Sequence, residues 1–207
     1  MELLVVVAIV GILAALLLPA MSSALRKAER TEFVGQMRSV GAAMNLYAFD
    51  HGGRFVGPLW PGQVAEFDAA RDGRLVRDLA PYLGIEAKPA PYVVPQFLPD
   101  AFRKALPGVA PKDIRVFVMN MSVPAETGTF NAWGSLAAQP ASTPQLRAAL
   151  PSTANRAWAM SEAYQTHPRV VSAAWRASTV PKPVYGSRPL ALFFDGSVAE
   201  VDPAELR

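Results

Sequence analysis

Cysteine is absent from this 207-residue chain, and histidine occurs only twice, at His51 and His167. Without cysteine the chain can form no disulfide, no thiolate metal site and no thiol nucleophile. Neither histidine has a second histidine or a carboxylate at the H-E-x-x-H spacing, so we expect no zinc site and no cofactor. The chain also lacks the G-x-x-x-x-G-K-[ST] pattern of a phosphate-binding loop, which argues against nucleotide hydrolysis.

Charged residues are scarce, at 18% of the chain, and the net charge is only +3. Lysine and arginine are scattered among acids rather than clustered, so we expect no nucleic-acid partner. A catalytic triad could be drawn from Ser161, His167 and one of several aspartates, but no G-x-S-x-G elbow surrounds Ser161. We therefore expect a protein that is not an enzyme.

Three acids near the C-terminus raise the question of a calcium site. Asp195, Glu200 and Asp202 do not form a recognisable loop of alternating oxygen ligands. We therefore expect no metal there.

The chain does contain one long uncharged run, Leu3–Leu25, headed by the single acid Glu2. As a helix its 23 residues would be about 35 Å long, enough to cross a bilayer core of ~30 Å. A signal-peptide core would be shorter and would follow basic residues, and a buried helix rarely stays apolar on all faces. We expect residues 1–25 to form a transmembrane or assembly helix. Ionised Glu2 is costly in hydrocarbon unless it is paired, although a helix N-terminus favours a negative charge.

The helix is expected to continue as an amphipathic segment over residues 26–53. Apolar side chains recur there at spacings of 4, 3, 4 and 3, as on one face of a helix. They are Phe33, Met37, Val40, Met44 and Tyr47. His51–Gly53 supplies a stop signal, and Pro19 should kink or loosen the helix locally.

Glu2–Arg30 resembles the N-terminal segment of type IV pilins and type II secretion pseudopilins. The resemblance rests on Glu2 at the head of the run, Gly11 nine residues later and Pro19 eight after that. It implies a pilin-like α+β fold, in which a long N-terminal helix, membrane-spanning in its first half, packs on an antiparallel sheet. It also implies a single pass through the inner membrane, a periplasmic or extracellular globular domain, and other pilin-like subunits or the chain itself as partners.

A weaker resemblance links the rest of the chain to prepilin-like proteins with a C-terminal H-X9-DG motif. Asp195–Gly196 supplies the last two positions, but Tyr185 stands where that motif has histidine. The family's leader peptide is cleaved by a prepilin peptidase, and only Met1 precedes Glu2 here, so the peptidase is expected as a partner only if a leader exists upstream. Counting basic residues alone would place residues 26–30 in the cytoplasm, whereas the resemblance places them outside, and we follow the resemblance.

The remaining residues, 54–207, are expected to form a globular α+β domain with long loops. We predict a short helix before Pro81 within Phe67–Gly84, an extended segment at Lys88–Pro99 and a flexible insertion over residues 137–155. Strands are predicted at Ile114–Met121, Arg156–Ala163, Arg169–Trp175, Leu190–Phe194 and Ser197–Val201. The last two flank Asp195–Gly196, a dipeptide that favours a type I′ hairpin turn.

Two functions remain open. The first is a membrane-anchored, pseudopilin-like structural subunit of a type II secretion or type IV pilus-like assembly. The alternative is a membrane-tethered periplasmic or surface protein that binds a polysaccharide or another protein. Trp133 and Trp158 could contribute to such a binding surface, but we expect most aromatic side chains to pack in the core.

Overall fold

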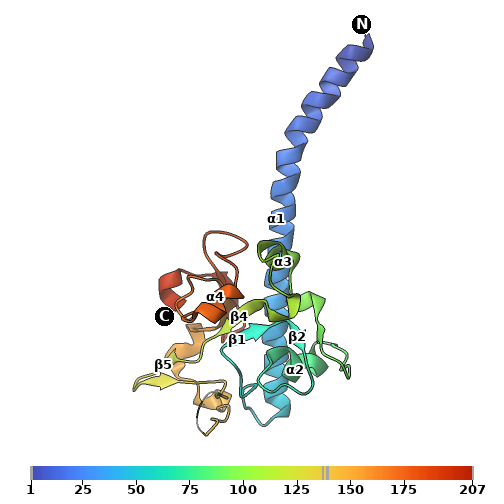
Figure 1. Ribbon diagram of the computed structural model, residues 1–207. Coiled ribbons are helices and arrows are strands. Elements are labelled where there is room, and N and C mark those ends of the chain that lie inside the picture. Colours follow the sequence, from blue (N-terminus) through green and yellow to red (C-terminus); the bar gives the residue numbers. More distant parts are fainter. Residues whose placement is uncertain (1, 137, 139, 207) are drawn as a thin grey trace.

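The computed structural model describes residues 2–136, 138 and 140–206; the side chains at 2–5, 8, 10, 14, 19, 153 and 155 lie outside this description. One long helix, α1 (Glu2–Asp50), projects from a globular domain (Figure 1). The other helices are α2 (Leu75–Leu79), α3 (Asp100–Ala105), α4 (Ala173–Ala177) and the 3-10 turns Ala80–Tyr82, Pro95–Phe97, Pro111–Asp113, Arg147–Ala149, Ser152–Arg156 and Pro203–Leu206.

The core of the domain is a five-stranded antiparallel sheet in the order β1-β4-β7-β8-β9. Its strands are β1 (Gly62–Val64), β4 (Arg115–Met119), β7 (Trp158–Glu162), β8 (Leu190–Phe193) and β9 (Val198–Glu200). Two small two-stranded antiparallel sheets lie outside it: β2 (Glu66–Phe67) with β3 (Tyr92–Val93), and β5 (Val123–Pro124) with β6 (Thr129–Phe130). A long N-terminal helix with an antiparallel sheet confirms the predicted α+β class.

The second half of α1 packs on this sheet through the predicted apolar stripe. Phe33, Met37, Val40 and Met44 are buried, and Tyr47 is half-buried. The ring of Phe33 stacks on Phe117 of β4 with a centroid distance of 5.8 Å. Burying the four fully buried side chains stabilises the docked helix by roughly 8–10 kcal/mol, so the amphipathic half belongs to the core of the domain.

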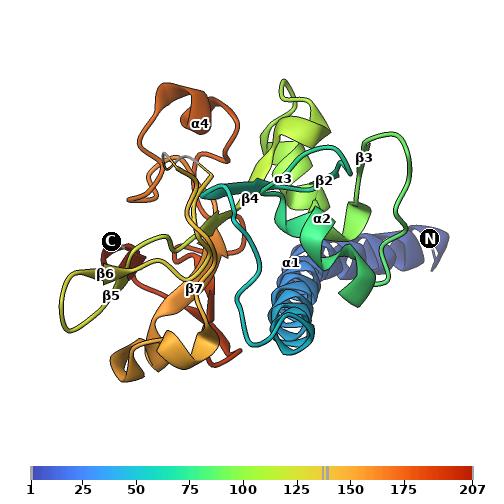
Figure 2. The ribbon, with the colours of Figure 1, turned by 90° about the horizontal axis from the view of Figure 1, so that it is seen from below.

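At Gly41 the helix α1 passes close to the sheet. A Cβ atom at Gly41 would lie 3.0 Å from Cδ1 of Leu192 on β8. Figure 2, seen from below, shows α2 and α3 beside α1 and the β5–β6 pair on the other side of the sheet. The glycine therefore lets the helix lie close to the strand next to the sheet edge.

The end of α1 follows the predicted stop signal. Gly52 adopts a left-handed conformation with φ of 63°, and Gly53 N–H donates to the Ala48 carbonyl at 2.7 Å. This six-to-one bond is the Schellman ending, which needs a residue without Cβ at the left-handed position. The helix therefore ends where sequence reasoning placed its end.

One predicted strand is wrong. Residues 169–175 form a loop followed by the start of α4, and Val171 is 76% exposed. Ser172 caps this helix, because its Oγ accepts from Trp175 N–H at 3.2 Å. The local capping interaction and the alanines that follow outweigh the short β-branched pair Val170–Val171.

The other predicted elements agree in part. The helix α2 ends ahead of Pro81, and the proline-rich Lys88–Pro99 contains only the two-residue strand β3 and a 3-10 turn. Within the predicted flexible insertion, positions 137 and 139 lie outside the described residues. Its Gln145 and Arg147 are tied by backbone hydrogen bonds to Phe55 and Gly53, at 3.0 and 2.8 Å, so this part of the insertion is attached to the domain.

Candidate functional site

The most conspicuous surface is the projecting half of α1, residues 2–25. Among its described side chains, ten large apolar ones are between 52% and 68% exposed: Val6, Val7, Ile9, Ile12, Leu13, Leu16, Leu17, Leu18, Met21 and Leu25. Leaving them in water costs on the order of 10 kcal/mol or more, and the globular domain covers none of them. Among the described residues α1 is long and apolar enough to cross a membrane, as its length and composition predict.

The sequence singled out Glu2, Gly11 and Pro19 on this segment. Successive rises of about 13 and 12 Å separate them along a helix, so they do not converge on one site. The side chains of Glu2 and Pro19 lie outside the described residues. The helix continues through Pro19, and its axis bends within its N-terminal part (Figure 1).

Gly11 has no packing role within the described chain. A Cβ atom built at Gly11 meets nothing within 4 Å. A glycine in a helix interior costs roughly 1 kcal/mol relative to alanine, and small residues are typical of close contacts between membrane helices. Within the described part of the chain, the surface at Gly11 is thus open to a neighbouring molecule.

The hairpin at Asp195–Gly196 joins β8 and β9, but its turn differs from the prediction. A type I′ turn needs a positive φ at Asp195, and Gly196, with φ of 87°, is the residue of this turn that has one. Gly196 N–H donates to the Phe193 carbonyl, and Phe193 N–H donates to the Ser197 carbonyl, both at 2.9 Å. The loop therefore has three residues: a type I turn followed by a left-handed glycine.

The side chain of Asp195 stabilises this turn by accepting hydrogen bonds from Ser197. Its Oδ1 accepts from Ser197 N–H at 2.8 Å and from Ser197 Oγ at 2.6 Å. These bonds from Ser197 lower the pKa of Asp195 below its usual value. Tyr185 stands at the histidine position of the H-X9-DG motif, and its ring packs on that of Phe33 with a centroid distance of 5.1 Å. Tyr185 precedes β8 and Asp195 follows it, so the two residues lie at opposite ends of that strand.

Ser161 and His167 do meet, but not in a geometry suited to a nucleophile. Both are buried, and Ser161 Oγ lies 2.8 Å from His167 Nε2. His167 Nδ1 accepts from Arg169 N–H at 3.0 Å, so the proton of the neutral ring is on Nε2 and is donated to Ser161. Burial, with a smaller contribution from Arg169, lowers the pKa of His167 to about 4, which keeps the ring neutral. A ring protonated at Nε2 cannot take the proton of Ser161 there, so the pair is a buried structural hydrogen bond.

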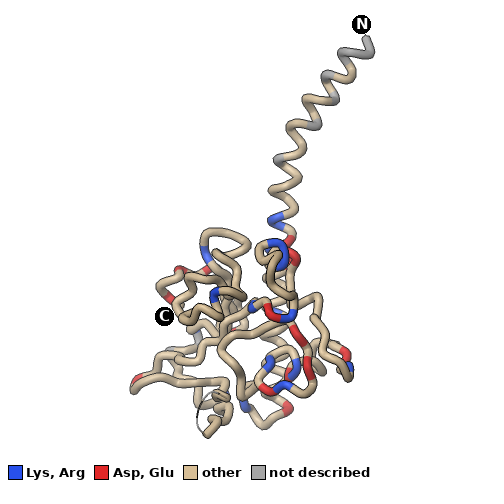
Figure 3. Tube along the Cα trace, in the orientation of Figure 1, with Lys and Arg blue, Asp and Glu red and all other residues tan. Residues whose placement is uncertain are grey.

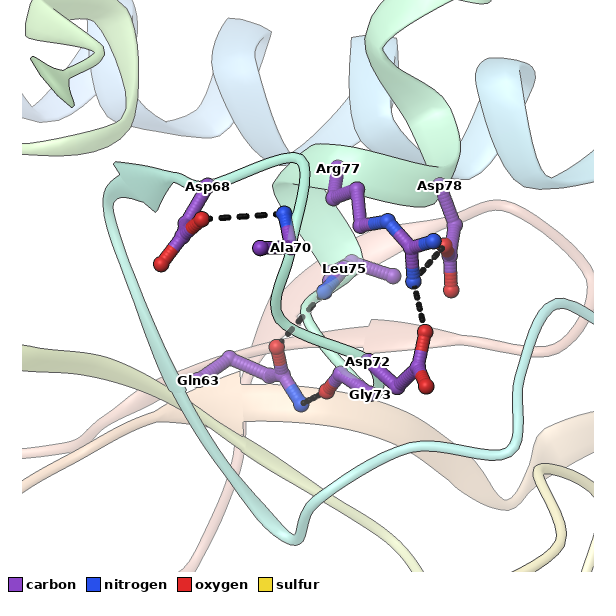
Figure 4. Close-up of polar contacts among 8 residues, drawn as sticks. All are labelled: Gln63, Asp68, Ala70, Asp72, Gly73, Leu75, Arg77 and Asp78. Atoms are coloured by element: carbon purple, nitrogen blue, oxygen red, sulfur yellow. Dashed lines mark hydrogen bonds and ion pairs between the residues drawn. The ribbon is translucent and has the colours of Figure 1, made fainter. Parts of the chain in front are cut away.

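A polar cluster between β1 and α2 is drawn in Figure 4. Buried Gln63 donates to the Gly73 carbonyl at 3.1 Å and the Trp60 carbonyl at 2.5 Å, and accepts from Leu75 N–H at 2.7 Å. One amide side chain thus satisfies three backbone groups: one ahead of β1, one in the loop before α2 and one at the start of α2. Sequence reasoning missed Gln63, because nothing local distinguishes it from an exposed glutamine.

Charged side chains surround the other side of the same loop. Arg77 pairs with Asp72 and lies 3.9 Å from Asp78 (Figure 4). Burial raises the pKa of Asp78 to about 6, against the opposing effect of Arg77. No group of three or more metal-ligating side chains occurs among the residues that the structure describes. The cluster ties the loop before α2 to β1 and to α2.

Among the hollows on the described part of the chain, two are large enough to be candidate binding surfaces. One, of about 480 Å³, lies between α1 and α3 and is lined by Glu29, Glu32 and Asp100 among other residues. The other, of about 520 Å³ and largely apolar, is lined by Pro61, Met119, Met121, Pro168, Arg169, Val171, Ser172 and Trp175. Trp133 and Trp158 are 1% and 5% exposed, which confirms core packing for both and removes them from any binding surface.

Comparison of the chain with known protein families, curated proteins and solved structures found no match.

Proposed function

We propose that this chain is a membrane-anchored structural subunit, similar to pseudopilins, of a type II secretion or type IV pilus-like assembly. The observation that carries the proposal is the projecting half of α1, whose ten exposed apolar side chains need either lipid or neighbouring helices. The same helix continues without interruption into the core of a domain built on an antiparallel sheet. The finer assignment to a pilin-like assembly rests on the residues Glu2, Gly11 and Pro19.

Assembly through this helix has a physical rationale. In a bundle of parallel helices, the carboxylate of Glu2 could pair with the positively charged N-terminus of a neighbour, and Gly11 could allow close approach. An unpaired carboxylate in hydrocarbon is unfavourable. Neighbouring helices whose axial register pairs Glu2 would therefore be more stable than helices whose register leaves it unpaired.

Because the sequence contains no cysteine, any disulfide crosslink can be assigned to a cysteine that has been introduced. Single cysteines placed in turn at positions 12, 13, 16, 17 and 18 of the full chain, reconstituted in lipid bilayers, should crosslink with helical periodicity. Leu46→Cys, on the domain-packed half but 54% exposed, serves as the control position. Adding Glu2→Leu should reduce crosslinking if register depends on the acid. Crosslinking that falls uniformly as the protein is diluted in lipid, with no periodicity, would refute assembly through α1.

The tethered binding protein is the second candidate, and the apolar hollow beside Trp175 is the observation that favours it. In that case the detergent-solubilised chain is a monomer with saturable binding of a polysaccharide or protein. Size-exclusion chromatography with light scattering separates the two functions, because assembly predicts larger species that depend on the projecting half.

A further inference from the structure

Three basic residues follow the uncharged run directly, and they lie where α1 reaches the globular domain. Arg26, Lys27 and Arg30 come after a run about 35 Å long, which exceeds a hydrocarbon core of ~30 Å. If residues 3–25 span a bilayer, this turn of α1 lies at the level of the lipid headgroups. Figure 3 shows the first blue segments of α1 at this level, where the helix meets the domain.

A hollow of about 300 Å³ opens beside these residues. It is lined by Ser22, Ser23, Arg26, Lys27, Arg30 and Tyr185, and we call it the basic hollow. Guanidinium, ammonium and hydroxyl groups are the donors that phosphate oxygens accept in proteins. The lining is therefore complementary to a phosphate group.

Tyr185 contributes the part of the basic hollow that does not come from α1, so the hollow forms only when the globular domain packs on the helix. It comes from the loop between α4 and β8, and its ring packs on Phe33. The flanks of this loop are held by buried Glu162, which accepts from Val184 N–H at 2.5 Å and from Leu190 N–H at 3.4 Å. Burial and nearby carboxylates raise the pKa of Tyr185, so its hydroxyl keeps the proton that it can donate.

The cations of the hollow are only partly engaged by the chain. Arg30 pairs with Glu200 at 2.6 Å, but both side chains are about 40% exposed, so the pair contributes little. Among the described residues, neither Arg26 nor Lys27 forms an ion pair. Glu29 and Glu32 on the same helix line the adjoining hollow beside α3, which shares Tyr185 with the basic hollow. Arg26 and Lys27 are both exposed and are therefore available to bind an anion.

We propose that the basic hollow binds the phosphate of an anionic phospholipid headgroup and thereby seats the globular domain against the membrane. The inference rests on the membrane anchoring in the proposed function but not on assembly. The geometry favours a lipid phosphate over free phosphate, because the helix that lines the hollow also brings it to the membrane surface.

The test uses the full chain in vesicles of phosphatidylcholine alone or with phosphatidylglycerol at 30 mole per cent. Amide hydrogen exchange of residues 184–188 reports how firmly the Tyr185 loop is held. Phosphatidylglycerol should slow exchange there, by up to about fivefold for each of the two unpaired cations. High salt should reduce this effect, because it screens charges at the membrane surface.

The variant Arg26→Gln/Lys27→Gln should lose the response to phosphatidylglycerol. The control Lys88→Gln/Lys112→Gln removes the same charge outside the hollow and should keep the response. Unchanged exchange in β4 and β7 shows that each variant is folded.

Several outcomes overturn the inference, and three of them concern lipid and phosphate. They are equal exchange in both lipids, a response that survives Arg26→Gln/Lys27→Gln, and equal protection by 10 mM inorganic phosphate in phosphatidylcholine vesicles, which assigns the hollow to free phosphate. A response that requires crowded protein assigns it to a neighbouring copy and also counts against a lipid site. Alkaline extraction of the same vesicles tests the anchor separately: a chain that is extracted refutes membrane spanning, whereas a retained chain without a lipid response refutes only the headgroup site.

Discussion

Glu162 and His167 lie close together in the sequence and are both buried, and their titrations should act on stability in opposite directions. Burial raises the pKa of Glu162 to about 7, although backbone N–H groups of Val184 and Leu190 oppose the shift. Burial lowers the pKa of His167 to about 4. The ordinary values are 4.5 and 6.5, so each group is shifted by about 2.5 pH units.

The sign of each effect follows from proton binding in the two states. The unfolded chain releases the proton of Glu162 near pH 4.5, whereas the folded chain holds it to about pH 7, so folding stability falls as the pH rises across this range. In the unfolded chain His167 gains a proton below pH 6.5, whereas in the folded chain it stays neutral down to about pH 4. Folding stability therefore falls as the pH drops across that range. Each effect amounts to about 3 kcal/mol over its full range.

The two slopes nearly cancel between pH 5 and 6.5, so the stability of the wild-type chain should depend little on these groups there. Glu162→Gln, which resembles the protonated acid, leaves the histidine slope, and stability should rise by about 2 kcal/mol from pH 5 to 6.5. His167→Gln leaves the glutamate slope, and stability should fall by about the same amount. The variants therefore have profiles of opposite sign.

The assay is urea unfolding of the full chain in non-ionic detergent, followed by the fluorescence of the buried Trp133 and Trp158. Asp78, whose pKa is also raised, contributes equally to all three proteins and cancels in the differences. Single variants with the same slope as the wild type would refute the reasoning, even if their absolute stability changed.

Three further predictions use the same unfolding assay. Gly41→Val should destabilise the domain by about 1–3 kcal/mol, because its side chain meets Leu192, whereas Gly35→Val, on the same helix with nothing within 4 Å, should change stability little; equal effects would contradict the packing at Gly41. Gly196→Ala should cost about 1 kcal/mol, because the residue has a left-handed φ; no loss would mean that the turn can change its type. Gln63→Leu should cost roughly 1–3 kcal/mol by leaving buried backbone groups unpaired, and a neutral result would show that water or a shifted loop replaces the amide.

Features governed by local periodicity could be predicted from the sequence. The stripe from Phe33 to Tyr47 and the glycine stop after α1 depend only on helical geometry and on glycine's freedom at positive φ. The location of the β8–β9 hairpin was predictable for a similar reason. Its turn type was not, because Phe194 enters the loop only when pairing with β7 and β9 sets the register.

Features governed by burial could not be predicted in the same way. Glu162 and Gln63 look like ordinary polar residues in the sequence, and His167 stands out there only as a candidate triad member; only the folded chain removes all three from water. The basic hollow likewise joins residues 22–30 to Tyr185, which are more than 150 positions apart in the chain. By contrast, the uncharged run before Arg26 could be recognised from the sequence, because its length as a helix can be compared directly with the thickness of a bilayer core.

The uninterrupted course of α1 has a mechanical consequence. No linker separates the apolar half from the half that packs on the sheet, so a force along the anchor cannot be absorbed by an extensible tether. It would pass along the helix and act in shear on the contact between α1 and β8, where Gly41 meets Leu192. The domain and its anchor would therefore yield together, because pulling the helix out would remove part of the domain's own core.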